Sequence, residues 1–317
     1  MRSLTIQPLT EAHLPAAAAL VCTRYTALQR AVPPLPAYSA EPRTLLPRLH
    51  DMAQRAAGAV AFHNGRLVGF LMAYHLERLR GRRGVFSPEW ANGVDPAVDA
   101  SVYAALYAHM AHQWVTAGYG LHGLSLFAND AAANEAWHWL GFGLAVADGV
   151  RDLTPLVTPP SPLTIRRATF ADLPQLVELD VALHHHLMAA PIFLPLGPSG
   201  DHTALADELA DPGYAFWTAW ERDEGVAFMK FGPVSINTCA VMYDPGTASI
   251  TGAFTKAAWR GQGVAATLLA RGLAWASAAG YTRCAVDFEP MNTPAARFWQ
   301  AHFRLVCLSQ LRSIDLC

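Results

Sequence analysis

The sequence has no long hydrophobic run, although 52% of its residues are hydrophobic. No apolar stretch approaches the roughly 20 residues that cross a bilayer, and no apolar leader follows Met1. The formal net charge of −2 gives no sign of a general binder of nucleic acid or anionic membranes. We therefore expect a soluble, cytoplasmic protein that has neither nucleic acid nor membrane as a partner.

Lysine and cysteine are both scarce. Lys230 and Lys256 are the only lysines, so the basic charge is almost entirely arginine. The cysteines are odd in number and scattered, with no CxxC pair: Cys22, Cys239, Cys284, Cys307 and Cys317. This usage predicts reduced thiols and neither a disulfide framework nor a zinc site, so we expect no metal.

The chain repeats itself. At 317 residues two domains are expected, and Leu4–Pro15 recurs as Leu163–Pro174, each copy a short strand, a threonine that can cap a helix, and an early proline. Ala117-Gly118-Tyr119 likewise corresponds to Ala279-Gly280-Tyr281. We predict a duplicated domain, with copies at 1–153 and 163–317 joined by the proline-rich linker 154–162.

Hydrophobic periodicity and turn residues predict similar elements in the two halves. In the first half, Asn64-Gly65 is a strong hairpin signal between two strands. The predicted strands there are 4–8, 59–63, 67–76, 85–86, 121–127 and 144–153, and the helices are 10–29, 42–56, 97–117 and 131–140. In the second half the predicted strands are 163–167, 214–221, 226–231, 248–254, 283–288 and 305–315, and the helices are 170–188, 203–210, 265–276 and 293–302.

The most informative stretch lies in the last quarter of the chain. The apolar strand 248–254 runs into a turn punctuated by Gly261 and Gly263, and a helix follows that Gly280 closes. A strand, a tight glycine turn and a helix N-terminus direct several backbone N–H groups and the positive end of the helix dipole to one place. Such a place binds a phosphate or pyrophosphate, although the same pattern also occurs as a plain tight connection.

The turn does not match the common nucleotide loops. No Gly-Lys-Ser/Thr follows the glycines, which excludes a nucleoside-triphosphate loop. Residues 261–266 meet only the weakest form of the dinucleotide fingerprint, Gly-x-Gly-x-x-Ala, and no acidic residue follows at the required distance.

Two motifs carry a resemblance to a known family. Arg260-x-x-Gly263-x-Ala265 stands between a strand and a helix, and Asn292-Thr293-Pro294-Ala295-Ala296-Arg297-Phe298-Trp299 opens the next helix. In this order they resemble the acetyl-CoA loop and the following Asn-x-x-Ala-x-x-Phe-Tyr signature of the GNAT superfamily of N-acetyltransferases. The resemblance implies an α+β fold of two tandem GNAT-like domains, each a mixed, mostly antiparallel sheet flanked by helices.

The resemblance also implies a cosubstrate and a reaction. Acetyl-CoA would donate its acetyl group to an amine that attacks the thioester directly. The implied contacts are a pyrophosphate cradle, a strand that pairs with the pantetheine and polarises the thioester, and side chains beside the coenzyme arm. The residues concerned are Ala253, Phe254, Thr255, Arg260, Gly261, Gln262, Gly263, Val264, Ala265, Asn292, Phe298 and Trp299.

The first half lacks the coenzyme loop. Its corresponding stretch, Pro88–Pro96, has no Arg-x-x-Gly-x-Gly/Ala, and Glu89 and Asp95 would repel a pyrophosphate. Asp130 stands where the second half has Asn292. We expect this copy to be degenerate, keeping the fold without the coenzyme.

The catalytic side chains are less defined. Where the family often has a tyrosine acid this chain has Trp299, and an indole N–H is a poor proton donor in that role. Tyr243, Glu289 or His302 are the candidate acid and base; a structural role for each, or an ordered-water relay, is the alternative.

The acceptor and the oligomeric state stay open. A small-molecule amine is the leading acceptor, in a pocket that the loop Pro191–Gly200 could border, and a monomer and a homodimer are equally compatible with the sequence. Two other functions remain: a non-catalytic acyl-CoA-binding sensor or scaffold, and a peptide or protein N-acetyltransferase.

Overall fold

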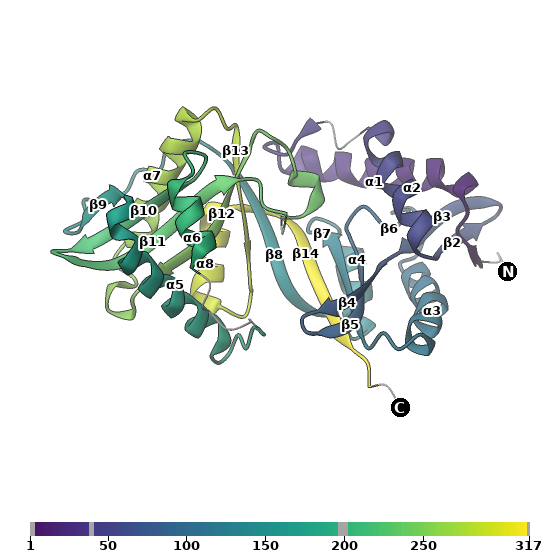
Figure 1. Cartoon of the computed structure of the whole chain (residues 1–317). Helices are drawn as coiled ribbons and strands as arrows, with labels where there is room; N and C mark the ends of the chain where they lie inside the picture. The colour runs from purple at the N-terminus through teal and green to yellow at the C-terminus, as the bar shows by residue number, and fades with distance from the viewer. Residues whose placement is uncertain (1–3, 38–40, 196–201, 237, 316–317) are drawn as a thin grey trace. The chain divides into compact units, whose positions relative to one another are not determined.

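The computed structural model describes residues 4–37, 41–195, 202–236 and 238–315 (Figure 1). Cys317 and residues 196–200 of the loop Pro191–Gly200 lie outside the described residues. The chain forms two compact units. Unit 1 comprises 1–148, 239–241 and 305–317, and unit 2 comprises 149–238 and 242–304.

Unit 1 contains two groups of hydrogen-bonded strands. Their orders are β1-β2-β3-β6 and β4-β5-β7-β14. The elements are β1 (Leu4–Pro8), η1 (Glu11–His13), α1 (Leu14–Ala31), α2 (Pro42–Arg55), β2 (Gly58–His63), β3 (Arg66–Met72), β4 (Tyr74–Leu79), β5 (Arg82–Ser87), β6 (Asn92–Val94), α3 (Ser101–Thr116), β7 (Leu121–Phe127), α4 (Ala131–Trp139) and β14 (Arg304–Ser313). Strand β8 (Gly143–Asp152) has residues in both units.

Aromatic side chains fill the core of unit 1. Helix α3 packs on β2 and β3, and its Tyr107 lies edge-on to Trp137 of α4 with ring centroids 5.4 Å apart. Trp137 is 1% exposed and also meets Phe142 at 4.9 Å. Edge-to-face pairs of this kind add to the stabilisation from apolar burial. The N-terminal half therefore has a core of its own.

Unit 2 is built on the sheet order β13-β12-β11-β10-β9. Helix α5 packs on β11 and β12, and α7 packs on β10 and β11. The elements are β9 (Thr164–Arg167), η3 (Phe170–Asp172), α5 (Leu173–Met188), α6 (Thr203–Ala210), β10 (Ala215–Glu221), β11 (Glu224–Pro233), η4 (Ala240–Met242, of which Met242 is in this unit), β12 (Thr247–Thr255), η5 (Ala257–Trp259), α7 (Val264–Ala278), β13 (Arg283–Phe288) and α8 (Thr293–His302).

The repeat at the start of each half has the same local structure. The Thr169 N–H donates to the Asp172 carboxylate at 2.8 Å, and the Thr10 N–H donates to Nδ1 of His13 at 3.1 Å. Each threonine thus starts a 3₁₀ turn that leads into a helix with proline in its first turn, α1 or α5.

The compact units differ from the boundaries expected from the sequence. Unit 1 ends within β8, at Asp148, and it takes in the final strand of the chain. Strand β14 pairs antiparallel with β7, Cys307 facing Phe127 and Ser313 facing Leu121. A strand joins the sheet edge that satisfies its backbone hydrogen bonds, and that edge need not belong to the same half of the sequence.

Most predicted elements are present within a few residues of their expected ends, and Asn64 and Gly65 form the expected hairpin turn with φ values of 52° and 75°. Two predictions are wrong. The single strand expected at 67–76 is divided between β3 and β4, which lie in different sheets. Strand β6 lies inside Pro88–Pro96, where we expected a loop. This three-residue strand is too short to show an alternating pattern.

Gly272 tests the packing of α7. A Cβ at this position would lie 1.9 Å from Cζ of Phe231, whose side chain is fully buried on β11. We expect Gly272→Ala to lower the free energy of unfolding by about 1–2 kcal/mol, because overpacking outweighs the better helix propensity of alanine. Urea denaturation measures the change.

Ser277→Ala is the control, since Ser277 is exposed on the same helix. An unfolding free energy for Gly272→Ala at or above that of wild type would contradict the close contact between α7 and β11.

Candidate functional site

The site in unit 2 begins where two parallel strands part. Strand β12 pairs with β13 from Thr247 to Ile250, opposite Arg283 to Val286. On its other edge β12 stays paired with β11 as far as Thr255. Over Ala253–Thr255, one edge of β12 therefore has no strand beside it among the described residues. Backbone N–H and C=O groups on that edge can pair with an extended ligand.

A cavity of about 470 Å³ lies at this unpaired edge. Its walls come from α5, β11, β12, the turn before α7, α7 itself and α8. The lining residues are Leu183, His186, Phe228, Met229, Ala253, Phe254, Thr255, Trp259, Arg260, Gly261, Gly263, Val264, Ala265, Ala266, Leu268, Asn292, Pro294, Ala295, Phe298, Trp299 and His302.

The turn into α7 needs its glycines. Gly261 and Gly263 have φ values of 75° and 78°, and Gly263 is the N-cap of α7. A Cβ on Gly263 would have ordinary contact, 3.7 Å from Pro159, so backbone conformation and not space requires glycine here. The first N–H groups of α7 lack helical acceptors and, with the positive end of the helix dipole, favour an anion.

Arg260 is held along the same turn. Its Nε donates to the Thr255 carbonyl at 2.9 Å, and its guanidinium carbon lies 5.6 Å from the centroid of the Phe254 ring. The side chain is exposed. Because the bond to Thr255 uses Nε, the terminal amino groups of the guanidinium are the part suited to contact a phosphate.

The other wall comes from α8. Asn292 is its N-cap residue, but its side chain makes no capping bond and lines the cavity. Phe298 contacts both Trp299 and His302 edge-on, with ring centroids 4.8 and 4.7 Å apart. Across the cavity, His186 of α5 lies 6.3 Å from the ring of Phe254.

His302 in the cavity wall and Asp287, which does not line the cavity, have shifted pKa values. Burial lowers the pKa of His302, and the charge of Arg151 lowers it further, so this imidazole is neutral at pH 7. Burial raises the pKa of Asp287 on β13 to about 6, with a further contribution from Glu289. Perturbed values of this kind often occur at functional sites.

The three predicted catalytic residues are not brought together. His302 lines the cavity, whereas Tyr243 and Glu289 do not. Tyr243 follows η4 with 45% of its side chain exposed, and Glu289 follows the end of β13. All the predicted coenzyme residues except Gln262 line the cavity; the Gln262 side chain turns back and donates to the Ala258 carbonyl at 2.8 Å.

The sequence reasoning did not assign several lining residues to the coenzyme site. Leu183, Phe228, Met229 and Leu268 have apolar side chains that in sequence cannot be told from core residues. His186 had a signal, the run of three histidines at 184–186, but nothing indicated which histidine faces a pocket. The remaining unassigned residues are Trp259, Ala266, Pro294 and Ala295.

In unit 1 an arginine binds the aspartate that stands where unit 2 has Asn292. Arg24 of α1 is 5% exposed, donates to the Asn92 carbonyl of β6 at 3.0 Å, and forms an ion pair with Asp130 at 2.8 Å. Asp130 is the N-cap of α4, as Asn292 is of α8, and accepts from the Ala133 N–H at 2.9 Å. A Cβ on Gly93 would lie 2.6 Å from this guanidinium.

Comparisons with known proteins agree with this architecture. Residues 182–303 match the family model described as "Acetyltransferase (GNAT) family", so the region that contains the cavity is a GNAT-family domain. The whole chain resembles the GCN5-related N-acetyltransferase from Sphaerobacter thermophilus, with a TM-score of 0.60, 15% identity, and coverage of 98% of this chain and 96% of that one. The predicted fold class, with GNAT-like folds across both halves, is confirmed.

A second structural relative is the GCN5-related glucosamine N-acetyltransferase region of a fungal multi-domain GH3 β-N-acetylglucosaminidase. The TM-score is 0.52 at 12% identity, over 98% of this chain and 38% of that one. These identities establish the fold alone. No curated protein matches the chain significantly in sequence. In the part of the chain that the structure describes, no helix is long and apolar enough to cross a membrane.

The raised pKa of Asp287 can be tested through the pH dependence of stability. Its folded pKa of about 6 exceeds the ordinary aspartate value, so raising the pH from about 4 to 7 deprotonates the unfolded state first and destabilises the fold. We expect Asp287→Asn to escape this loss and to gain up to about 3 kcal/mol of unfolding free energy relative to wild type over that range.

Urea denaturation at each pH measures the effect. Asp207→Asn is the control, because Asp207 is exposed on α6. If Asp287→Asn and wild type change in parallel between pH 4 and 7, the carboxyl does not have the raised pKa.

Proposed function

We propose that the protein is an acetyl-CoA-dependent N-acetyltransferase that acetylates a small-molecule amine in unit 2. The observation that carries the proposal is the meeting, at one cavity, of the unpaired edge of β12 and the glycine turn into α7. The unpaired strand edge suits an extended chain with amides, and the glycine turn suits a diphosphate. Coenzyme A has both parts. The GNAT-family match over residues 182–303 supports the assignment.

The turn and β12 would divide the work of binding. The N–H groups at the start of α7 and the Arg260 guanidinium would hold the pyrophosphate. The backbone of Ala253–Thr255 would pair with the pantetheine amides. A backbone N–H on this strand would also stabilise the oxyanion that forms as the amine attacks the thioester, an effect of about 3 kcal/mol in comparable sites.

Proton transfer would rely on the cavity histidine. His302 is neutral at pH 7, because burial and Arg151 lower its pKa, so it can accept a proton from the incoming ammonium. Trp299 occupies the position where the resemblance implied a tyrosine, and its indole supplies no acid for the leaving thiolate. In this proposal, solvent protonates the thiolate.

A second function has one observation in its favour. The replacement of an acid by Trp299 is also compatible with a protein that binds acyl-CoA without turning it over. Release of free CoA thiol in the presence of a panel of amines distinguishes the enzyme from the sensor.

Unit 1 would bind no coenzyme. Residues 88–96 lack the Arg-x-x-Gly-x-Gly/Ala motif of the coenzyme loop, and Asp130, which stands where unit 2 has Asn292, is paired with Arg24. Breaking this ion pair would leave the buried guanidinium of Arg24 without its carboxylate partner, which costs several kcal/mol. We therefore propose that the chain binds a single acetyl-CoA.

Calorimetry checks the binding site. We expect one CoA per chain, and at least tenfold weaker binding in Arg260→Glu and in Gly263→Val, because the first reverses a charge at the pyrophosphate and the second forces a β-branched residue to a positive φ. Arg271→Glu is the matched control, since Arg271 is exposed on α7 and does not line the cavity. Two CoA per chain, or unchanged affinity in both variants, would contradict the proposal.

The pH dependence of the rate checks His302. Because the pKa of His302 is lowered, we expect kcat/KM to fall only at a pH below the ordinary imidazole pKa, as the imidazole becomes protonated. His302→Asn should lose 10²-fold or more in rate together with this acidic limb. Glu289→Gln and Tyr243→Phe serve as comparisons, because neither residue lines the cavity. If His302→Asn keeps the rate and the profile, an ordered-water relay replaces the histidine.

A further inference from the structure

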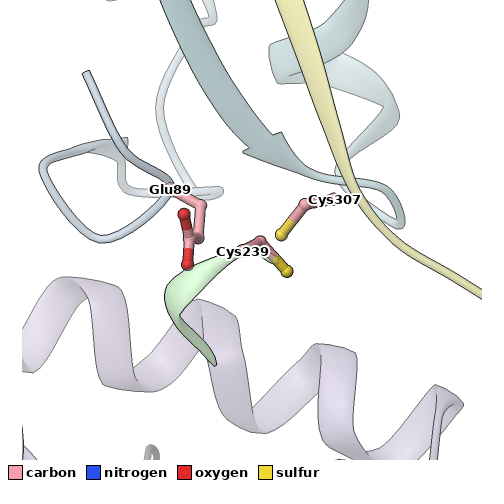
Figure 2. A group of neighbouring side chains, drawn as sticks. All are labelled: Glu89, Cys239 and Cys307. Carbon is pink, nitrogen blue, oxygen red and sulfur yellow. The ribbon is translucent and has the colours of Figure 1, made fainter. Parts of the chain in front are cut away.

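Three side chains of types that commonly bind metals lie close together in the interior of unit 1. Glu89 lies in the loop after β5, Cys239 precedes η4, and Cys307 is in β14. Their ligand atoms all lie within 4.8 Å of one another, as Figure 2 shows with Cys239 between the other two. All three residues belong to unit 1. They come from segments far apart in the sequence, so no local motif such as a CxxC pair could indicate the cluster.

The three side chains are buried. Glu89, Cys239 and Cys307 are 2%, 8% and 0% exposed. Buried cysteines are common, but a buried carboxyl group beside them is unusual, because acidic side chains are almost never fully buried unless they are paired. The burial therefore calls for a physical explanation that packing alone does not supply.

The segment that carries Cys239 is fixed by two carboxyl groups. Glu89 Oε1 accepts the N–H of Val241 at 3.0 Å, and Asp148 Oδ1 accepts the N–H of Cys239 at 3.0 Å. Asp148 is itself 3% exposed. These bonds hold the backbone of residues 239–241, so they orient the Cys239 thiol toward Cys307. Hydrogen bonds around a ligand are the usual means by which proteins position metal ligands.

We propose that Glu89, Cys239 and Cys307 form a buried site for a thiophilic divalent cation, and that this cation is Zn²⁺. Two thiolates and one carboxylate are a donor set that Zn²⁺ accepts and that Mg²⁺ and Ca²⁺ do not favour. Zinc–sulfur distances of about 2.3 Å and zinc–oxygen distances of about 2.0–2.2 Å place ligands roughly 3.5 Å apart, so side-chain movements of about 1 Å suffice.

Ion binding is accompanied by proton release. The two thiols lose their protons to solvent as the zinc–sulfur contacts form, and no oxidant or reductant takes part. Burial raises the pKa of Cys307 to about 12 and raises the pKa of Cys239 and of Glu89 as well. Without a cation the two thiols are therefore protonated; a bound cation stabilises their thiolate forms.

Three protein ligands leave one position of a tetrahedral ion. Closed structural zinc sites have four protein ligands, and sites with three keep a solvent or exchangeable fourth ligand. The site would join the loop after β5, the segment 239–241 and β14, which the sequence supplies from three separate places. Because it would join these three segments, we assign it the role of holding unit 1 together, with solvent as the fourth ligand. It does not depend on the coenzyme proposal, since none of its residues lines the cavity of unit 2.

Titration of the full-length chain with Cd²⁺ after treatment with a chelator tests the site, because cadmium thiolates absorb by charge transfer in the ultraviolet. We expect absorption that saturates at one Cd²⁺ per chain, displacement of Cd²⁺ by Zn²⁺, and a higher Tm with either ion. Cys239→Ser and Cys307→Ser should each lose most of the absorption. Glu89→Gln should keep the thiolates but bind at least tenfold more weakly.

Two variants keep the result interpretable. Glu89→Gln retains a side-chain oxygen that can accept from the Val241 N–H, so we expect it to fold. It therefore still tests the site if a cysteine variant fails to fold. Cys284→Ser is the matched control, a buried cysteine of unit 2 outside the cluster, and should titrate as wild type does. No thiolate absorption in wild type, or equal absorption in Cys239→Ser, overturns the proposal. So does a Cys239–Cys307 disulfide in protein isolated with its thiols blocked.

Discussion

The parting of β12 from β13 is the constraint on which the cavity depends. Beyond Ile250 the two strands no longer exchange hydrogen bonds, and the polar backbone of Ala253–Thr255 faces the gap. A buried backbone group without a partner costs about 1–3 kcal/mol, so such an edge is stable only where solvent or a ligand can pair with it. The glycine turn adds a second constraint at the same place, because positive φ at Gly263 starts α7 with its free N–H groups toward the cavity.

The two halves share one architecture but differ in what the N-cap side chain of the helix after the parallel strand contacts. In unit 2 the N-cap side chain of α8, Asn292, lines a cavity. In unit 1 the N-cap of α4, Asp130, is paired with a buried arginine and caps its own helix. The two N-cap side chains therefore differ in what they meet: Asp130 binds an arginine of its own unit, whereas Asn292 faces a cavity.

Prediction from sequence succeeded where local physics decides the structure. The Asn64-Gly65 turn, the capped starts of the two repeats and the bounds of α8 depend on residues next to one another, and the structure has them as predicted. It failed for β6, which is too short to show a period. The pairing of β14 with β7 could not be predicted from any local pattern either, because pairing depends on which sheet edge is available. Gln262 was assigned to the cradle through its backbone N–H, and that assignment stays a prediction, since the bond to the Ala258 carbonyl involves only its side chain.

The sequence by itself determined the motif order, the duplication and the fold class, since glycine conformation, capping and hydrophobic period act within a few residues. Tertiary structure alone decided that His302 and His186 face one cavity while Tyr243 and Glu289 do not line it. It also decided that Arg24 pairs with Asp130, and that Glu89, Cys239 and Cys307 converge. The physical reason is distance along the chain: such contacts form only when folding brings separate segments together, and no local preference specifies which segments meet.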